Sequence, residues 1–184
     1  YSLALSMVLE VMERSKVGMT AVNVGGGFPA RYLGANVPIL EDYMSAIETG
    51  LKTLSLANDT ELFCEPGRGL VADGMSVLAK VELRKASSLY INDGIFGHFL
   101  ESHFHNFRVP TRAIRPGAQF SSDKQHFKIF GSTCDGNDLL PGEVQFPIDI
   151  REGDWIEFES MGAYSLALSS GFNGFATESS VLIS

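Results

Sequence analysis

The chain has 184 residues, of which 45% are hydrophobic and 20% are charged, and this composition excludes disordered chains, collagen-like chains and small disulfide scaffolds. The formal net charge of -8 at pH 7 argues against the basic surface that nucleic acid or an anionic membrane would require. We therefore expect no nucleic-acid partner and no membrane partner, and a small cationic substrate fits the charge better.

The two cysteines, Cys64 and Cys134, form neither a disulfide framework nor a zinc pattern, so the expected compartment is the reduced cytoplasm. We find no apolar run of about 18 residues, as a membrane span would need, and no export signal. Cys64 stands on a predicted strand, where we expect it to be buried as an apolar residue. The first residue, Tyr1, already lies in a helical pattern, which suggests that further sequence precedes it.

Residues 1–75 alternate helix and strand patterns. Apolar residues at helical spacing predict one helix before Gly18 and a second helix that begins near Pro38. The second helix has one apolar stripe, formed by Leu40, Tyr43, Ile47 and Leu51. Short apolar runs over 21–24 and 61–64 predict two strands of an α/β fold. Because two strands and two helices cannot cover a parallel sheet on both faces, we interpret this part as the end of a larger domain.

From about Val77 the apolar period changes to two, which is typical of half-buried strands. Turn sequences such as Pro141-Gly142 separate the strand candidates. These candidates are 77–84, 89–92, 109–115, 127–130, 155–159 and 181–183. Residues 76–184 are therefore interpreted as an all-β domain, which could also contribute a last strand to the preceding domain.

Two loops follow the two strands of the first part, where βα loops carry the chemistry of such folds. Gly25-Gly26-Gly27 allows the backbone to approach an anion, and its successive N–H groups can converge on phosphate oxygens. In Glu65-Pro66-Gly67-Arg68, the arginine can pair with phosphate and the glutamate can hold a cationic ring nitrogen. Taken alone, the glycines could form a simple loop and the tetrapeptide a salt bridge at a tight turn.

Six motifs, in order, indicate a family. They are Gly-Gly-Gly-Phe-Pro, Glu-Pro-Gly-Arg, Tyr-Ile-Asn-Asp-Gly, Thr-Cys-Asp, Gly-Asp-Trp, and Met-Gly-Ala-Tyr followed by Phe-Asn-Gly-Phe. Over residues 22–175 the chain resembles the ornithine/diaminopimelate/arginine decarboxylases, fold type III pyridoxal-phosphate enzymes, and most resembles the ornithine or ornithine/lysine branch. The resemblance implies an α/β plus all-β chain: the final βα units of a (β/α)8 TIM-like barrel, followed by a C-terminal antiparallel β-domain.

The resemblance further implies pyridoxal 5'-phosphate as cofactor and a homodimer with shared active sites. Glu65 would keep the ring nitrogen protonated, so that the ring can accept the electrons released at the substrate Cα. The implied cofactor-binding residues are Gly25, Gly26, Gly27, Glu65, Gly67, Arg68 and Tyr164. Read without the family, Tyr164 could instead be a core tyrosine with a satisfied hydroxyl.

Cys134 is implied to be the proton donor in the partner subunit's site, with Asp93 and Asp135 holding the distal ammonium of a basic amino acid. The implied reaction is decarboxylation of L-ornithine to putrescine, in polyamine biosynthesis. Lysine or diaminopimelate decarboxylation remains an alternative, as does a non-catalytic homologue acting as a regulatory binding partner. From the residues alone, Asp93 could instead form an Asn-Asp-Gly turn and Cys134 could be a loop cysteine without a role.

Two further points qualify this interpretation. No lysine of the chain stands in the sequence context of the family's Schiff-base lysine, so the chain contains about half of each active site. His103 and His105 could bind a metal from one strand face, but no third ligand is evident, and we expect an exposed strand face and no metal. His98 stands where relatives often carry a small residue, and we assign it no role.

Overall fold

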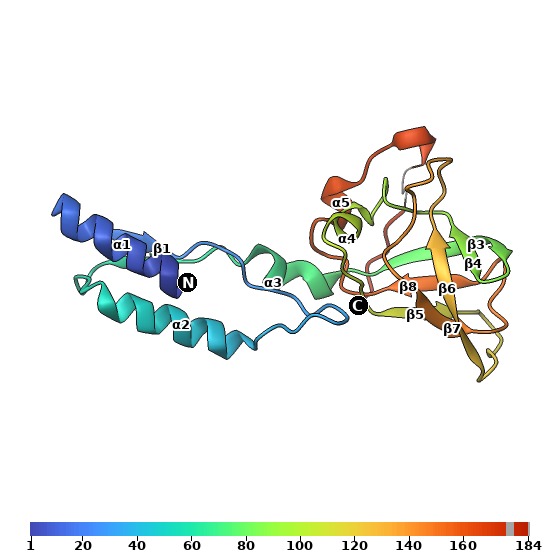
Figure 1. Cartoon of the computed structure of the whole chain (residues 1–184), viewed down its shortest axis with the longest axis horizontal. Coiled ribbons are helices and arrows are strands. Elements are labelled where there is room, and N and C mark those ends of the chain that lie inside the picture. The colour runs from blue at the N-terminus through green and yellow to red at the C-terminus, as the bar shows by residue number, and fades with distance from the viewer. Residues whose placement is uncertain (176–178, 184) are drawn as a thin grey trace. The chain divides into compact units, whose positions relative to one another are not determined.

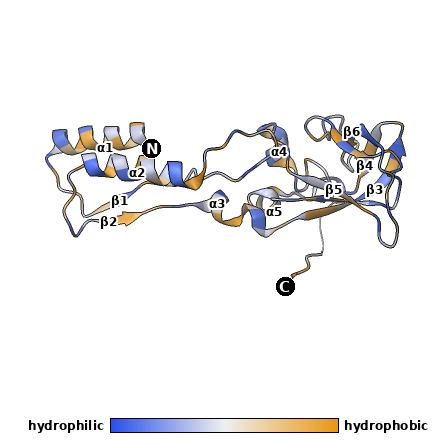
Figure 2. Cartoon of the chain, turned by 90° about the horizontal axis from the view of Figure 1, so that it is seen from below, coloured by the Kyte–Doolittle hydropathy of each residue, from blue (hydrophilic) through white to orange (hydrophobic). Residues whose placement is uncertain are grey.

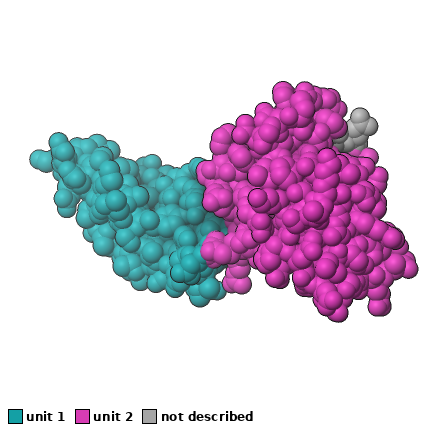
Figure 3. Space-filling model, turned by 45° about the vertical axis from the view of Figure 1, so that its right-hand side comes forward, with its two compact units in different colours: residues 1–30, 36–70 teal, residues 31–35, 71–184 magenta. Residues whose placement is uncertain are grey.

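The structure is a computed structural model that describes residues 1–175 and 179–183 (Figure 1). Two compact units are distinguished by colour in Figure 3. The α/β unit contains residues 1–30 and 36–70, and the β unit contains residues 31–35 and those from 71 onward. In the described ranges, no helix has both the length and the apolar character needed to cross a membrane.

The α/β unit has the expected order of helix, strand, helix and strand. Its elements are α1 (Ser2–Ser15), β1 (Ala21–Asn23), α2 (Leu40–Thr53), β2 (Glu61–Phe63) and α3 (Gly67–Val71), whose last residue falls in the β unit. The strands β1 and β2 pair in parallel, with Val22 opposite Leu62. The helices α1 and α2 pack together on one side of this strand pair (Figure 2). The sequence patterns for these elements are thus confirmed.

Each long helix buries one apolar residue, Leu5 in α1 and Ile47 in α2. The rest of the expected stripe on α2 is more exposed, as Leu40 shows. All three residues of β2 are exposed, and Cys64, directly after β2, is exposed too. The expectation that Cys64 is buried is therefore wrong, because an apolar pattern predicts burial only where a second layer covers the strand.

The β unit is built on one curled sheet (Figure 1). Its elements are the 3₁₀ turn η1 (Ala72–Gly74), β3 (Val77–Lys85), β4 (Ser88–Ile91), α4 (Leu100–Phe104), β5 (Thr111–Ile114), β6 (Lys124–Phe130), β7 (Val144–Pro147), β8 (Trp155–Phe158), α5 (Ser165–Leu168) and η2 (Phe172–Gly174). The strand order is β5-β8-β3-β4-β6-β7. The two edge strands β5 and β7 also contact each other, so the sheet curls toward closure.

Three details of this sheet differ from the sequence expectations. The pair β4–β6 is parallel, with Tyr90 opposite Phe130, so the domain is not wholly antiparallel. The strand β7 was not expected, since it is short and only Phe146 is buried within it. Residues 181–183 form no strand: their apolar side chains are exposed, and within the described chain no strand pairs with them.

The core of the β unit follows the period-two pattern of its strands. In β3, Ala79 and Val81 point to one face and are fully buried, while Leu78 and Glu82 on the other face are exposed. Aromatic rings fill the interior, and Phe99 packs edge-on against Phe158 at 4.6 Å between ring centroids. The buried cluster consists of Val77, Ala79, Val81, Leu89, Ile91, Phe99, Val109, Phe127, Ile129, Leu140, Phe146, Ile150, Ile156, Phe158 and Met161.

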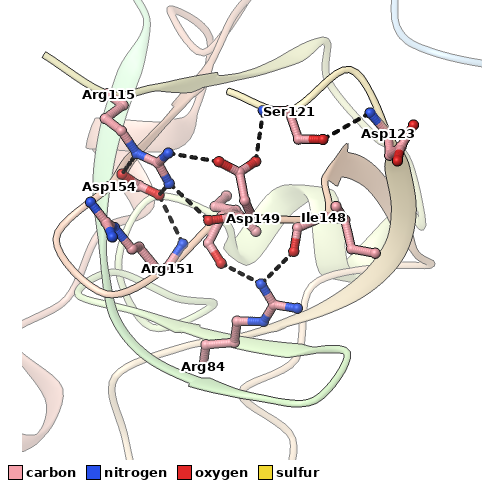
Figure 4. Close-up of polar contacts among 9 residues, drawn as sticks. Arg84, Arg115, Ser121, Asp123, Ile148, Asp149, Arg151 and Asp154 are labelled. Carbon is pink, nitrogen blue, oxygen red and sulfur yellow. Dashed lines mark hydrogen bonds and ion pairs between the residues drawn. The ribbon is translucent and has the colours of Figure 1, made fainter. Parts of the chain in front are cut away.

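A guanidinium group closes the turn between β7 and β8 (Figure 4). Arg115 donates to both carboxylate oxygens of Asp154, at 2.7 Å each, and to Asp149 Oδ2 at 2.8 Å. The other oxygen of Asp149 accepts from the Ser121 backbone N–H at 2.9 Å. Hydrogen bonds from Arg115, and secondarily from Ser121, hold the pKa of Asp149 below its usual value. This turn is therefore fixed by charge-assisted hydrogen bonds.

Arg84 reinforces the same turn from β3. Its Nη1 donates to the backbone carbonyls of Ile148 and Ile150, at 2.6 Å each. The Arg84 backbone N–H donates to Glu152 Oε1 at 2.7 Å, and this bond lowers the pKa of Glu152. Two arginines thus satisfy carbonyl and carboxylate groups that the turn itself leaves unpaired.

We expect Phe127→Ala to destabilise the β unit by about 3–5 kcal/mol, because it opens a cavity in a close-packed core. Phe127 is fully buried, whereas its neighbour Lys128 on β6 is exposed. Lys128→Ala is therefore the matched control, with a change within about 0.5 kcal/mol. Urea unfolding followed by circular dichroism measures both, and equal effects of the two substitutions would contradict this description of the core.

The Arg115–Asp149 pair predicts a pH dependence of stability. Because the folded-state pKa of Asp149 lies below its ordinary value of 3.8, the ionised pair stabilises the fold above that pH, and the contribution is lost as the pH falls through the folded-state pKa. Arg115→Gln should therefore lower the thermal midpoint clearly at pH 7 and less at pH 3.

Arg112→Gln provides the comparison, since Arg112 pairs with Glu157 through a side chain that is 66% exposed, and exposed pairs contribute little. The prediction fails if Arg115→Gln lowers the midpoint temperature of thermal unfolding by the same amount at pH 7 and at pH 3.

Candidate active site

In the α/β unit, main-chain hydrogen bonds bring the two chemistry-bearing loops together. Beyond the paired strands, the Val24 N–H donates to the Phe63 carbonyl at 2.9 Å, and the Glu65 N–H donates to the Gly25 carbonyl at 2.8 Å. The parallel pairing therefore continues past the ends of β1 and β2. As a result, the glycine loop and Glu65 lie side by side at the carboxyl ends of the two strands.

The glycine loop adopts a backbone that side chains would not permit. Gly25 and Gly27 have left-handed φ angles of 74° and 85°, and a Cβ on Gly26 would lie 2.6 Å from the Glu65 carbonyl oxygen. Among the described residues, no atom outside the adjacent chain lies within 4 Å of the Cβ position at Gly25. The loop thus leaves open room beside exposed backbone, which suits a phosphate group.

Tyr1 lies against the same loop and donates its hydroxyl hydrogen to the Gly26 carbonyl. Its ring packs near those of Phe28 and Tyr43, at centroid distances of 5.6 and 6.1 Å. Burial raises the pKa of the Tyr1 hydroxyl, so this group remains a neutral hydrogen-bond donor near pH 7. The glycine loop is therefore supported from its own unit by an aromatic cluster.

Asn23 orients Glu65, a role that the sequence did not reveal. Its side-chain Nδ2 donates to Glu65 Oε1 at 2.6 Å, and its Oδ1 accepts from the Gly25 N–H at 2.8 Å. One amide thus fixes both the carboxylate and the start of the glycine loop. The only sequence signal was a polar residue at the end of a strand, two residues before the glycines.

Arg68 lies in α3, which begins directly after the Glu65-Pro66 turn. The Gly67 N–H donates to the Glu65 carbonyl at 2.9 Å, which closes this turn. Glu65, Gly67, Arg68 and the glycine loop therefore belong to one compact unit. An exposed backbone loop, a guanidinium and an oriented carboxylate are the groups that would hold a phosphorylated cationic ring, so these residues fit pyridoxal phosphate.

In the β unit, Asp93 is held by its own loop after β4. Its Oδ1 accepts from the backbone N–H groups of Gly94 and His98, at 2.7 and 3.1 Å. Its Oδ2 lies 2.7 Å from His98 Nδ1, and the two side chains are only 10% and 4% exposed. The histidine that received no role from the sequence is therefore the main side-chain partner of Asp93. Asp93 also lines a small hollow together with Thr133 and Phe175.

Cys134 and Asp135 lie in the loop after β6. Cys134 is an exposed free thiol, and its Sγ accepts from Asn173 Nδ2 at 3.5 Å. Asp135 Oδ1 accepts from the Asn137 backbone N–H at 2.8 Å, which stabilises the turn. The next carboxylate, Asp138, is buried and accepts from Thr133 Oγ1 at 2.7 Å. Asp138 lies three residues after the Thr-Cys-Asp motif, and nothing in the sequence was a reason to assign it a function.

Tyr164 stands at the start of α5 with a left-handed φ of 64°, a conformation that is uncommon and costly for a bulky residue. The segment before it is anchored to the chain ahead of β3, because Met161 N–H donates to the Met75 carbonyl and Gly162 N–H to the Ala72 carbonyl, at 2.8 Å each. Tyr164 is half exposed. It is therefore not a core tyrosine, the alternative that the residues alone had left open.

The remaining histidines lie differently from the expectation. His103 is in the helix α4 and His105 follows it, so the expected strand face is wrong. Residues 99–107 form successive helical hydrogen bonds, such as His103 N–H to the Phe99 carbonyl at 3.1 Å. Residues at i and i+2 of a helix do not share a face. In the described part of the chain, no group of three or more His, Cys, Asp or Glu side chains could hold a metal ion.

Comparison with known proteins gives consistent matches to both units. Residues 1–72 match the pyridoxal binding domain of the pyridoxal-dependent decarboxylases, and residues 71–162 match the C-terminal sheet domain of the same family. Ornithine decarboxylase of Cricetulus griseus is 32% identical over 178 residues, which cover 85% of this chain and 37% of that protein. Antizyme inhibitor 2 of Xenopus laevis is 30% identical over 206 residues, covering 95% of this chain and 42% of that protein.

A solved structure shows the same fold. The lysine/ornithine decarboxylase of Vibrio vulnificus, complexed with cadaverine, superposes with a TM-score of 0.80 at 26% identity, covering 97% of this chain and 51% of that one. The chain spans about two fifths of the length of the curated relatives it matches. The resemblance seen in the sequence motifs is thereby confirmed. The chain belongs to the pyridoxal-dependent decarboxylase family and comprises the end of its pyridoxal-binding barrel domain, followed by its C-terminal β-sheet domain.

Proposed function

We propose that the protein decarboxylates a basic amino acid, with L-ornithine as substrate and putrescine as product, and so serves polyamine biosynthesis in the cytoplasm. The observation that carries this proposal is the Glu65 carboxylate, oriented by Asn23 beside the glycine loop. A carboxylate in this place has a clear use in holding a protonated pyridine nitrogen. A protein that only bound a partner would not need it.

Pyridoxal phosphate, when bound, supplies a ring that accepts the electron pair left at the substrate Cα after carbon dioxide departs. Glu65 would keep a proton on the ring nitrogen, and Asn23 would keep Glu65 pointed there. The phosphate would be bound by Gly25–Gly27, with Gly67, Arg68 and Tyr164 as further cofactor-binding residues. We place the boundary between the cofactor-binding domain and the β-domain near residue 75.

The β unit would supply the proton donor, and the carboxylates that bind the substrate, to the active site of the partner subunit in a homodimer. Cys134 would deliver a proton to the substrate Cα, for which an exposed thiol in a loop is accessible. Asp135 and Asp93 would bind the distal ammonium. Support for Asp93 comes from its place in the wall of the hollow that Thr133, next to Cys134, also lines. Its hydrogen bonds with His98 would restrict the carboxylate to one orientation.

Ornithine is preferred over the other basic amino acids because two aspartates suit a simple terminal ammonium. Diaminopimelate carries a second carboxylate, which those aspartates would repel. Lysine is the second choice, since one methylene changes discrimination by only about 1–3 kcal/mol.

The direct test compares kcat/KM for ornithine, lysine, arginine and diaminopimelate on the full-length protein with pyridoxal phosphate. We expect ornithine to be the best substrate, with lysine lower by a factor of about 10 to 200. A preference for diaminopimelate would refute the assignment of the aspartates.

Cys134→Ala tests the proton donor. Product formation should fall by a factor of about 10² to 10⁴, as for loss of a general acid, whereas cofactor affinity should stay within about twofold, since the substitution removes no cofactor contact. Cys64→Ser, at the other exposed cysteine, is the control for loss of a thiol as such. Equal loss of cofactor binding and product formation in Cys134→Ala would count against its role as acid.

A non-catalytic binding partner is the second candidate, favoured by the match of antizyme inhibitor 2 over 95% of this chain. Measurements on the full-length protein with pyridoxal phosphate distinguish the enzyme from the binding partner. If the full-length protein shows neither the visible absorbance of bound cofactor nor release of carbon dioxide from any basic amino acid, the enzymatic proposal is lost and the binding function stands.

A further inference from the structure

Asp138 lies at the junction of two loops of the β unit and is 1% exposed. Its Oδ1 accepts from the Ile95 backbone N–H at 2.8 Å. Its Oδ2 accepts from the backbone N–H of Thr133 at 3.0 Å and from the Thr133 hydroxyl at 2.7 Å. One buried carboxylate therefore joins the loop after β4 to the loop after β6.

The two loops are shaped to admit this carboxylate. A Cβ on Gly94 would lie 2.2 Å from Asp138 Oδ1, and a Cβ on Gly131 would lie 2.0 Å from the same atom. Real side chains cannot approach so closely. Glycine at both positions therefore leaves the space that the carboxylate occupies, one glycine on each loop.

The chemistry of the donors explains why a carboxylate suits this place. Three donors from Ile95 and Thr133 converge on Asp138, and an ionised carboxylate offers two acceptor oxygens and no hydrogen of its own. Burying such a charge is costly unless hydrogen bonds compensate it. An amide would turn its NH2 group toward one of the donors, so asparagine could satisfy only one of the two loops.

Both loops carry residues of the proposed active site. Asp93 directly precedes Gly94 on the first loop, and Cys134 and Asp135 follow Thr133 on the second. The Asp138 main chain adds to the link, because its N–H donates to the Asp135 carbonyl at 3.0 Å and its carbonyl accepts from Gly131 N–H at 2.8 Å. The position of Asp138 therefore affects all three of these side chains.

We propose that Asp138 is a positioning residue, which fixes the substrate-binding Asp93 loop relative to the loop of Cys134 and Asp135. Asp138 would touch neither substrate nor cofactor. The inference rests on the proposed function for its effect on turnover, but the link between the two loops is a property of the β unit alone.

Asp138→Asn in the full-length protein is the main test. We expect kcat/KM for the basic amino acid to fall by a factor of about 10 to 100, because small misplacements of catalytic groups have effects of this size. KM should rise and kcat should fall, whereas the affinity for pyridoxal phosphate should stay within about twofold, since no cofactor-binding group is moved. Hydrogen exchange should become faster for at least one of the Ile95 and Thr133 amides, namely the one that faces the asparagine NH2 group and loses its acceptor.

Asp149→Asn is the matched control, since it alters another hydrogen-bonded carboxylate of the β unit that holds neither loop. It should lower stability but leave kcat/KM and the two amides unchanged. Thr133→Val removes the hydroxyl, which donates to Asp138 at 2.7 Å and accepts from the Asp135 N–H at 3.4 Å. It should lower kcat/KM as Asp138→Asn does, whereas Thr133→Ser retains both contacts and should restore kcat/KM. If Asp138→Asn does not fold, the comparison of Thr133→Val with Thr133→Ser tests whether the hydrogen bonds of Asp138 position the loop.

The proposal is overturned if a folded Asp138→Asn keeps kcat/KM and both exchange rates within about twofold of the wild type, or if Asp149→Asn has the same effects. If the wild type releases no carbon dioxide from any basic amino acid, the proposed function fails instead. The exchange rates of Ile95 and Thr133 then still test the link between the loops.

Discussion

The arrangement of the candidate site depends on close main-chain approaches that exclude a Cβ. At Gly26 the glycine loop passes so near Glu65 that a side chain would contact its carbonyl oxygen. At Gly94 and Gly131 two loops pass equally near the Asp138 carboxylate. In each case the absent side chain leaves room for a polar group, which then forms its own hydrogen bonds. The glycines of the motifs are thus required by packing as well as by backbone freedom.

Carboxylates in the β unit have two roles, stabilising a turn or connecting loops, and the groups that donate hydrogen bonds to them differ between the two roles. Asp149 and Asp154 pair with the guanidinium of Arg115, which locks a turn and adds stability that depends on pH. Asp138 has neutral donors from two loops, and Asp93 is engaged by its own loop and by His98. The backbone and hydroxyl donors of Asp138 orient its carboxylate without cancelling the charge, which is compatible with the cationic substrate that we propose.

Sequence patterns predicted the order of elements well, because helical and strand periodicities report which face is buried. They failed where tertiary pairing decides: β7 needed β6 as partner, residues 181–183 pair with no strand of the described chain, and α4 replaced an expected strand. The placement of the glycine loop beside Glu65, after two neighbouring strands, could be predicted from the motifs. Asn23 and Asp138 could not, since their importance lies in contacts with residues distant in sequence or in another loop.

The residues of the proposed chemistry belong to two units, and the contacts described for each set lie within its own unit. Asn23 orients Glu65 using only residues of the α/β unit, and Asp138 joins its two loops using only residues of the β unit. A change that abolished cofactor binding would therefore leave the acidic loops of the β unit intact. The reverse holds for a change in those loops.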